Sequence, residues 1–144
     1  MRADILPAIL AKTETEFREK LRMIEGVAPL VHLDVMDGKF VPSTTWADPK
    51  VVTTMQTPVK FEVHLMVEEP FRDALAWGEV PSVARIVVHA ESTKLLRELL
   101  HVVRVTDKEV GLAMSPGTKI ADLRSQISDS IDFLLLMANE PGFA

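Results

Sequence analysis

The sequence contains no cysteine among its 144 residues. This absence excludes disulfide bonds, thiolate metal sites and a cysteine nucleophile. A metal site in this chain would therefore have to use histidine nitrogen or carboxylate oxygen atoms.

Long apolar runs and clusters of positive charge are also missing. No apolar run reaches the roughly eighteen residues that a membrane span requires. The 16 Lys and Arg residues are scattered and the formal net charge is −5, so no basic surface for nucleic acid is indicated. Residues 1–4 lead directly into a strand-like segment, which is not the pattern of a signal peptide. These features predict a cytoplasmic protein that binds neither nucleic acid nor membrane.

Strand-like and helix-like segments alternate along the chain. Strands are expected at residues 5–10, 30–36, 59–66, 84–89, 109–114 and 131–137. Helices are expected between them: after a capping box at 13–16, over 48–55, over 70–77, from a Ser92 cap to Val103, and over 120–127. This alternation predicts an α/β fold with parallel strands joined by right-handed crossovers.

Two architectures fit this pattern: an open doubly wound sheet, or a (β/α)₈ TIM barrel cut short. No glycine-rich phosphate loop follows the first strand, where a nucleotide-binding open sheet would carry it. Polar residues lie instead in the C-terminal halves of the strands, where barrel enzymes place their active sites. A complete barrel typically needs about 250 residues. The sequence therefore predicts one incomplete barrel domain of about six strands over residues 1–144.

Imidazole and carboxylate side chains recur on the second and third expected strands. Because side chains alternate between the two faces of a strand, His32 and Asp34 share a face, as do Glu62 and His64. Neighbouring strands lie about 4.8 Å apart, so His64 can reach the point where His32 and Asp34 meet. A lone histidine in a strand is more often a hydrogen-bonded core residue. Two histidines and one aspartate on like faces of neighbouring strands instead favour a site for one divalent ion of Zn, Fe, Mn or Co. His89, near the end of the fourth strand, is a further candidate ligand, although a structural role or one at the substrate rim is preferred.

Four methionines lie at or next to the C-terminal ends of the expected strands. They are Met36, Met66, Met114 and Met137. Methionine commonly fills irregular gaps in a core. A non-protic lining around a reactive intermediate is the alternative interpretation.

An eleven-residue segment at the second strand resembles the signature of the ribulose-phosphate 3-epimerases. Residues 32–42 read HLDVMDGKFVP. Other segments resemble further parts of this family in the same order: residues 5–10, 63–67, 88–91, 111–116, 135–137 and 141–143. The resemblance covers the whole chain.

The resemblance implies a ribulose-phosphate-binding type of barrel and a reaction at a phosphorylated ketopentose. The family moves one proton at C3 of D-ribulose 5-phosphate and produces D-xylulose 5-phosphate. A metal on the C2 and C3 oxygens stabilises the enediolate, while two carboxylates act on opposite faces of it. The resemblance makes Asp34 one of these two acid/base groups and a metal ligand together with His32 and His64. It also implies substrate-binding roles for Met36, Met66, Met137 and Gly142.

The resemblance further implies that the chain is C-terminally truncated relative to the family. Family members continue into a seventh strand, which carries a fourth metal ligand and the second acid/base aspartate. We expect the open edges of the first and sixth strands either to drive assembly into a homo-oligomer or to mark a fragment of a longer gene product. We also expect these 144 residues alone to lack normal epimerase turnover.

Other functions remain open at this point. A non-catalytic scaffold or interaction protein would keep the core without the reaction. An epimerase of a related phosphoketose would use the same metal ligands. A phosphosugar decarboxylase or aldose-phosphate synthase fits less well, because those enzymes usually carry an Asp-x-Lys-x-x-Asp pattern on a strand and residues 32–37 lack that lysine.

Overall fold

Six parallel strands alternate with helices in a computed structural model that describes residues 5–127 and 130–142. The strands are β1 (Ala8–Ile9), β2 (Leu30–Met36), β3 (Lys60–Met66), β4 (Val83–His89), β5 (Glu109–Met114) and β6 (Phe133–Leu136). The helices are α1 (Glu14–Ile24), α2 (Pro49–Thr53), α3 (Phe71–Gly78), α4 (Leu96–Arg104) and α5 (Ile120–Ile127). Met1 to Asp4 and Phe143, which entered the sequence interpretation, lie outside the described residues.

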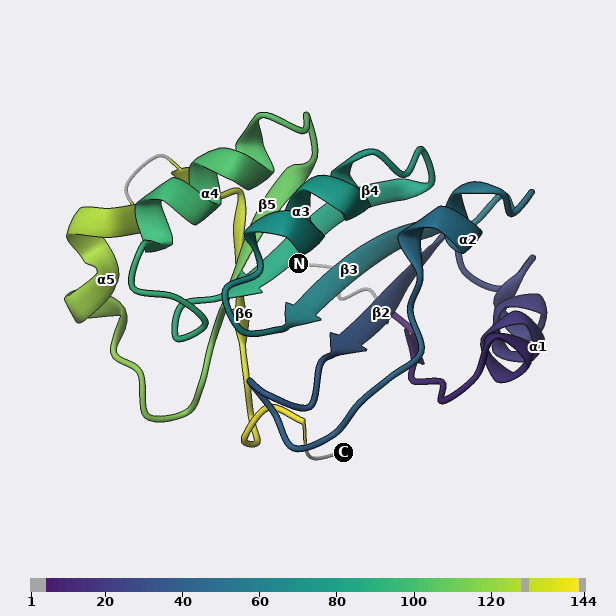
Figure 1. Ribbon diagram of the computed structural model, residues 1–144, viewed down its shortest axis with the longest axis horizontal. Helices are drawn as coiled ribbons and strands as arrows, with labels where there is room; N and C mark the ends of the chain where they lie inside the picture. The colour runs from purple at the N-terminus through teal and green to yellow at the C-terminus, as the bar shows by residue number, and fades with distance from the viewer. Residues whose placement is uncertain (1–4, 128–129, 143–144) are drawn as a thin grey trace.

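The strand order distinguishes the two architectures that the sequence left open. Each new strand adds to the same edge of the sheet, in the order β1-β2-β3-β4-β5-β6, and every pair is parallel. An open doubly wound sheet reverses its strand order at a switch point, and the described sheet has no such reversal. In Figure 1, α1 lies at one end of the strand series and α5 at the other. This winding is that of a partial TIM barrel.

The outer face of the sheet packs against the helices and forms the main core. Alternate residues of the central strands are almost fully buried there because their side chains point to the same face. The members from β2, β3 and β4 include Val31, Leu33, Val35, Phe61, Val63, Leu65, Ile86 and Val88. The helices contribute Phe17, Trp77, Leu99, Leu100 and Val103. The remaining alternate positions of these strands are therefore left for the inner face.

The inner face carries rows of polar residues that run across the strands. In one row the register pairs His32 with Glu62 and Glu62 with Arg85, and Arg85 in turn with Glu109. In the next row Asp34 pairs with His64. Polar side chains from neighbouring strands are thus placed at the same heights inside the curved sheet.

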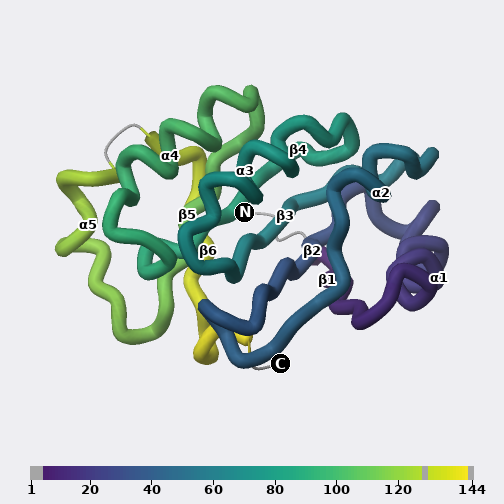
Figure 2. Tube along the Cα trace, viewed as in Figure 1, coloured from purple at the N-terminus to yellow at the C-terminus, as the bar shows by residue number. Residues whose placement is uncertain are grey.

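The sheet curls so that β6 returns towards β2. In a flat sheet these strands would lie about 19 Å apart, since each step between strands is about 4.8 Å. The hydroxyl group of Ser43, in the loop after β2, donates instead to the carbonyl oxygen of Gly142, after β6, at 3.1 Å. In Figures 1 and 2, which share one viewing direction, the segment after β6 is drawn beside the loop after β2, in agreement with this hydrogen bond. Self-association through the edges of β1 and β6 stays a prediction.

Some expected boundaries were wrong. The first strand covers two residues rather than 5–10, because Pro7 has no N–H to extend the ladder and Ile5 is 92% exposed. Ser92 does not cap α4, which begins at Leu96, because the Ser92 hydroxyl donates to the carbonyl oxygen of His89. By contrast, the Thr13 cap of α1 is confirmed, since its side chain accepts the N–H of Glu16.

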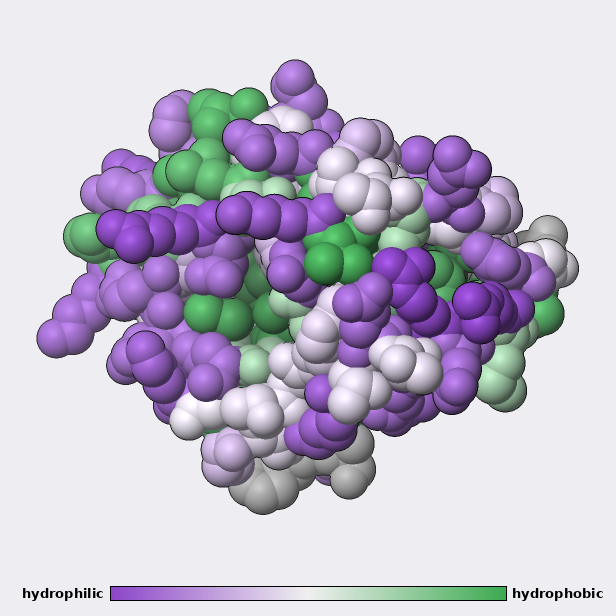
Figure 3. All heavy atoms as spheres, turned by 45° about the vertical axis from the view of Figure 1, so that its right-hand side comes forward, coloured by the Kyte–Doolittle hydropathy of each residue, from purple (hydrophilic) through white to green (hydrophobic). Residues whose placement is uncertain are grey.

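Hydrophilic side chains cover most of the face in Figure 3, with hydrophobic side chains gathered in separate patches. Within residues 5–127 and 130–142, none of the helices has the length and apolar character of a membrane span.

The close contact between Gly78 of α3 and Thr106, in the turn after α4, yields a stability prediction. A Cβ atom added to Gly78 would lie 2.6 Å from the Cβ of Thr106, whose hydroxyl is tied to the carbonyl oxygen of Val103. Helix propensity alone favours alanine over glycine by about 1 kcal/mol, but overpacking costs about 1–3 kcal/mol. We expect Gly78→Ala to lower the free energy of unfolding measured with urea. Gly117→Ala is the matched control, since open space surrounds Gly117; a stabilised Gly78→Ala protein would contradict the packing argument.

Candidate metal centre

β2 and β3 bring His32, Asp34 and His64 together at the inner face of the sheet. His32 Nε2 lies 3.1 Å from Asp34 Oδ1 and 3.2 Å from His64 Nδ1. His64 Nδ1 lies 3.0 Å from the same Asp34 oxygen. The His64 side chain is 1% exposed, and those of His32 and Asp34 are 14% and 13% exposed. Three potential ligand atoms therefore converge in a largely buried place.

The spacing of these atoms fits a bound divalent cation. Metal–ligand bonds of about 2.0–2.2 Å, with angles between octahedral and tetrahedral values, place ligand atoms about 2.8–3.6 Å from one another. The observed separations of 3.0–3.2 Å fall inside that range. Two imidazoles and one carboxylate suit Zn, Fe, Mn or Co, so this cluster could bind a metal without selecting its identity.

The charges of the cluster depend on mutual hydrogen bonds. Burial by itself lowers the pKa of His32, but hydrogen bonds to Asp34 and Glu62 outweigh burial and raise that pKa to about 9. Burial raises the pKa of Asp34, yet hydrogen bonds from His32 and His64 outweigh it and hold that pKa far below its usual range. Burial lowers the pKa of His64. Asp34 is therefore ionised at neutral pH and provides the negative charge that a cation needs.

Glu62 anchors the far side of the His32 ring. Its Oε1 atom lies 2.7 Å from His32 Nδ1, and its Oε2 atom accepts from Arg85 Nη1 at 3.1 Å. An ionised carboxylate only accepts, so His32 donates through Nδ1 and turns Nε2 towards Asp34. No role for Glu62 was predicted from the sequence. Its position two residues before His64, on the same strand face, was the available signal.

His89 lies behind His64 rather than beside the three converging atoms. Its Nε2 atom is 2.8 Å from His64 Nε2, and its side chain is fully buried. Its Nδ1 atom lies 3.2 Å from Glu91 Oε2. Among the described residues, His89 therefore does not belong to the group of converging ligand atoms. It contacts one member of that group, His64, from behind.

A cavity of about 160 Å³ opens over the cluster. Every site residue expected from the sequence lines it: His32, Asp34, Met36, His64, Met66, Met137 and Gly142, together with Leu10 and Leu135. Met114 does not, because it lies on the opposite face of β5 and packs in the core between sheet and helices. The C-terminal ends of β2, β3 and β6 thus meet around one cavity, as expected for a barrel site.

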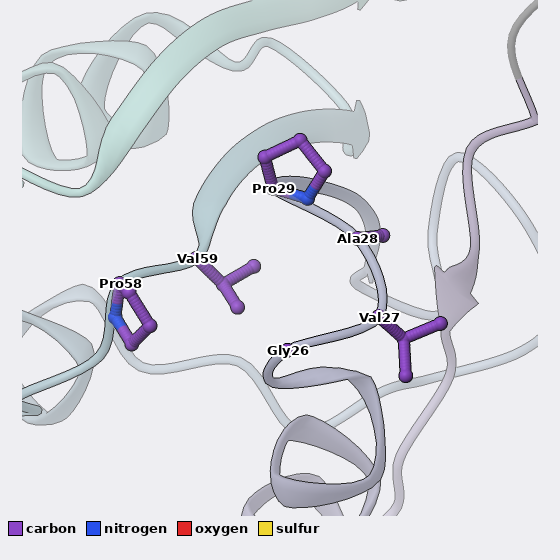
Figure 4. Close-up of a pocket in the computed structure, with 6 residues that line it drawn as sticks. All are labelled: Gly26, Val27, Ala28, Pro29, Pro58 and Val59. Atoms are coloured by element: carbon purple, nitrogen blue, oxygen red, sulfur yellow. The ribbon is translucent and has the colours of Figure 1, made fainter.

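A larger hollow lies at the opposite ends of the strands (Figure 4). It encloses about 310 Å³ and is lined by Gly26, Val27, Ala28, Pro29, Pro58 and Val59. None of these lining residues has a titratable side chain, so this hollow offers no group for proton transfer or metal binding.

Comparisons with known proteins agree with this geometry. The model of the ribulose-phosphate 3 epimerase family matches residues 4–144. The ribulose-phosphate 3-epimerase of Chlamydia muridarum is 35% identical over 142 residues, which cover 96% of this chain and 61% of the relative. That of Bacillus subtilis is 31% identical over 96% of this chain and 64% of its own length. That of Treponema pallidum is 35% identical over 97% of this chain and 64% of its own length.

This chain therefore spans somewhat less than two thirds of the length of these curated relatives. The match nevertheless runs through all six strands, including the segments that bear the converging histidines and aspartate. On this evidence the chain belongs to the ribulose-phosphate 3 epimerase family.

Proposed function

We propose that this chain carries the metal-binding part of an epimerase site for D-ribulose 5-phosphate, with D-xylulose 5-phosphate as the product. The observation that carries the proposal is the convergence of His32, Asp34 and His64 at 3.0–3.2 Å below a cavity. A phosphorylated ketopentose is the ligand, as the names of the family and of its relatives suggest.

Asp34 has the properties that a base at C3 requires. Its carboxylate is ionised, lies on the cavity wall and is oriented by hydrogen bonds from two histidines. It takes the C3 proton, which the neighbouring C2 carbonyl acidifies, and leaves an enediolate. A divalent cation held by His32, Asp34 and His64 would offset the negative charge that develops on the C2 and C3 oxygens.

The methionines provide an apolar wall for the planar intermediate. Met36 and Met66 are 7% and 1% exposed and pack in one cluster with Val41, Leu10 and Phe40. Thioether groups donate no proton, so they do not compete with Asp34 for the intermediate. Met137 completes this lining from the β6 side.

Gly142 lies at the phosphate end of the proposed site. Its φ angle is +82°, and a Cβ atom there would lie 2.6 Å from the Cβ of Val41. Only glycine fits both the backbone conformation and this close approach. The backbone N–H of the half-buried Gly142 can then face an anionic group without a side chain between them.

Proton exchange in heavy water tests this proposal. Among the described residues that line the cavity, Asp34 is the one carboxylate. If the same carboxylate removes the C3 proton and returns one to the same face, hydrogen is exchanged with the solvent but the configuration at C3 is not inverted. We expect the manganese-loaded chain to exchange the C3 hydrogen of one epimer at least about a hundredfold faster than it forms the other. Proton NMR follows both processes. Absence of exchange by a folded, metal-loaded chain would refute Asp34 as the base, and product formation at the rate of exchange would refute a lone carboxylate.

A further inference from the structure

A second cavity adjoins the one over the metal cluster. It encloses about 490 Å³ and lies between the segment after β1, the first turn of α1, the loop after β2 and the segment after β6. Three residues line both cavities: Leu10, Met36 and Gly142. The second cavity is therefore next to the proposed metal site, on the side where β1 and β6 end.

The phosphate group of the proposed substrate belongs on this side. When the C2 and C3 oxygens face the metal cluster, the phosphate lies two carbons beyond C3 and points away from the cluster. Gly142, at the proposed phosphate end, is on the border between the two cavities. A phosphate that enters the second cavity needs hydrogen-bond donors and positive charge. The polar side chains of that cavity decide whether both are supplied.

The two hydroxyl groups that line the second cavity already donate elsewhere. The Ser43 hydroxyl donates to the carbonyl oxygen of Gly142 at 3.1 Å. The Thr45 hydroxyl donates to the carbonyl oxygen of Asp34 at 2.8 Å. A hydroxyl group has a single proton to donate. Neither side chain can therefore donate to a phosphate without giving up a contact that holds the loop after β2.

The one carboxylate on the wall of the second cavity is Glu16, and it disfavours an anion. Its Oε2 atom accepts the backbone N–H of Lys12 at 2.7 Å. Its Oε1 atom accepts from the Lys20 ammonium group at 2.6 Å, an ion pair one turn along α1. Lys20 thus offsets the negative charge of Glu16, and the sign of the cavity wall depends on the remaining polar side chain, that of Lys12.

Within the described part of the chain, Lys12 is the one lysine or arginine that lines either cavity. Its ammonium group donates to the carbonyl oxygen of Thr44, in the loop after β2, which holds the side chain across the second cavity. An ammonium group has three N–H donors, and this contact uses one of them. Two donors and a full positive charge are left for an anion.

We propose that Lys12 binds the phosphate group of the sugar substrate, in the cavity that it shares with Gly142. This inference rests on the proposed function. Lys12 follows β1 and Gly142 follows β6, so the phosphate would connect the first and last strands of the described sheet. Because a positive charge attracts a phosphate far more strongly than a hydroxyl group, Lys12 would select phosphorylated ketoses over unphosphorylated ones.

Lys12→Met tests this role, because methionine keeps much of the side-chain length and removes the charge. Titrations of the chain with D-ribulose 5-phosphate and with D-ribulose, in the presence of Zn²⁺ and followed by ¹H–¹⁵N spectra, give the affinity for each sugar. We expect the affinity for the phosphorylated sugar to fall about tenfold, the effect of losing one hydrogen bond to a charged group at an exposed side chain. The affinity for D-ribulose should not change. Lys12→Arg keeps the charge and should stay within about threefold of the wild type.

Lys60→Met is the matched control. The Lys60 ammonium group also donates to a backbone carbonyl oxygen, that of Pro81 at 3.3 Å. Lys60 is the first residue of β3, at the opposite end of the strands, and lines neither cavity. Its replacement removes the same charge from the chain and should leave both affinities unchanged. Circular dichroism establishes that all three variants are folded.

The two sugars and the control separate the possible outcomes. Equal affinities of the wild-type and Lys12→Met chains for D-ribulose 5-phosphate would overturn the inference, and so would an equal loss in Lys60→Met. A loss of the same size for D-ribulose would place Lys12 at the sugar rather than at the phosphate. A chain that binds the phosphorylated sugar through Lys12 but exchanges no C3 hydrogen would refute the proposed function and leave this inference standing.

Discussion

Asp34→Asn is expected to lower the rate of C3 hydrogen exchange by at least about a thousandfold. General acid–base catalysis alone contributes about 10²–10⁴-fold, and this substitution also removes the one anionic ligand of the converging cluster. Asparagine has nearly the volume of aspartate, so the loss should come from chemistry rather than from packing. Proton NMR in heavy water, at saturating Mn²⁺, measures the rate.

The control for Asp34→Asn removes a negative charge elsewhere. Asp122, in the first turn of α5, is exposed and does not line the cavity, so Asp122→Asn should exchange hydrogen at the wild-type rate. Circular dichroism establishes that both variants are folded. An Asp34→Asn protein that retains more than about a tenth of the wild-type rate would exclude Asp34 as the base, since even the weakest general base contributes more than that.

His64→Ala is expected to weaken Zn²⁺ binding by more than about a hundredfold. An altered outer partner of a ligand already costs about 10–100-fold, and this substitution removes a ligand itself. It leaves His32 and Asp34 as the two remaining members of the converging group. Calorimetric titration of the metal-free chain gives the affinity and the stoichiometry, which should be one ion per wild-type chain.

His101→Ala provides the comparison for the histidine substitution. His101 is an exposed residue of α4, a helix that packs on the outer face of the sheet, and it does not line the cavity over the cluster. Its removal should leave Zn²⁺ binding unchanged. Equal affinities of the His64→Ala and wild-type chains would show that the ion binds somewhere other than the candidate centre. A folding check is needed here as well, because His64 is buried between Asp34 and His89.

Local periodicity was sufficient to predict which candidate metal ligands share a face of the sheet. A strand places every second side chain on one face, so His32 and Asp34 had to share a face wherever the strand lay. The same rule applied to His64 and Met66, and the regular alternation of strands and helices made β2 and β3 parallel neighbours. All seven expected site residues therefore line one cavity.

Met114 was grouped with the other methionines at strand ends, although period two separates it from the inner face. The one polar residue of β5 is Glu109, which lies on the inner face beside Arg85, and Met114 lies five positions further along, on the opposite face. Gly111 and Ala113 share the inner face with Glu109, so the alternation of the strand places Met114 in the helix-covered core. Met137 instead reaches the cavity. Two methionines with similar places in the sequence thus lie on opposite sides of the sheet.

The sequence alone determined the parallel α/β order, the period-two placement of His32, Asp34 and His64, and a boundary as local as the Thr13 cap of α1. These depend on neighbours a few residues away, whose geometry backbone sterics fix. Only the tertiary structure decided that Glu62 holds His32, that His89 backs His64, and that Gly142 reaches the loop after β2. Such contacts join residues 25–99 positions apart, and they follow from the register and curvature that the packed core imposes on the whole sheet.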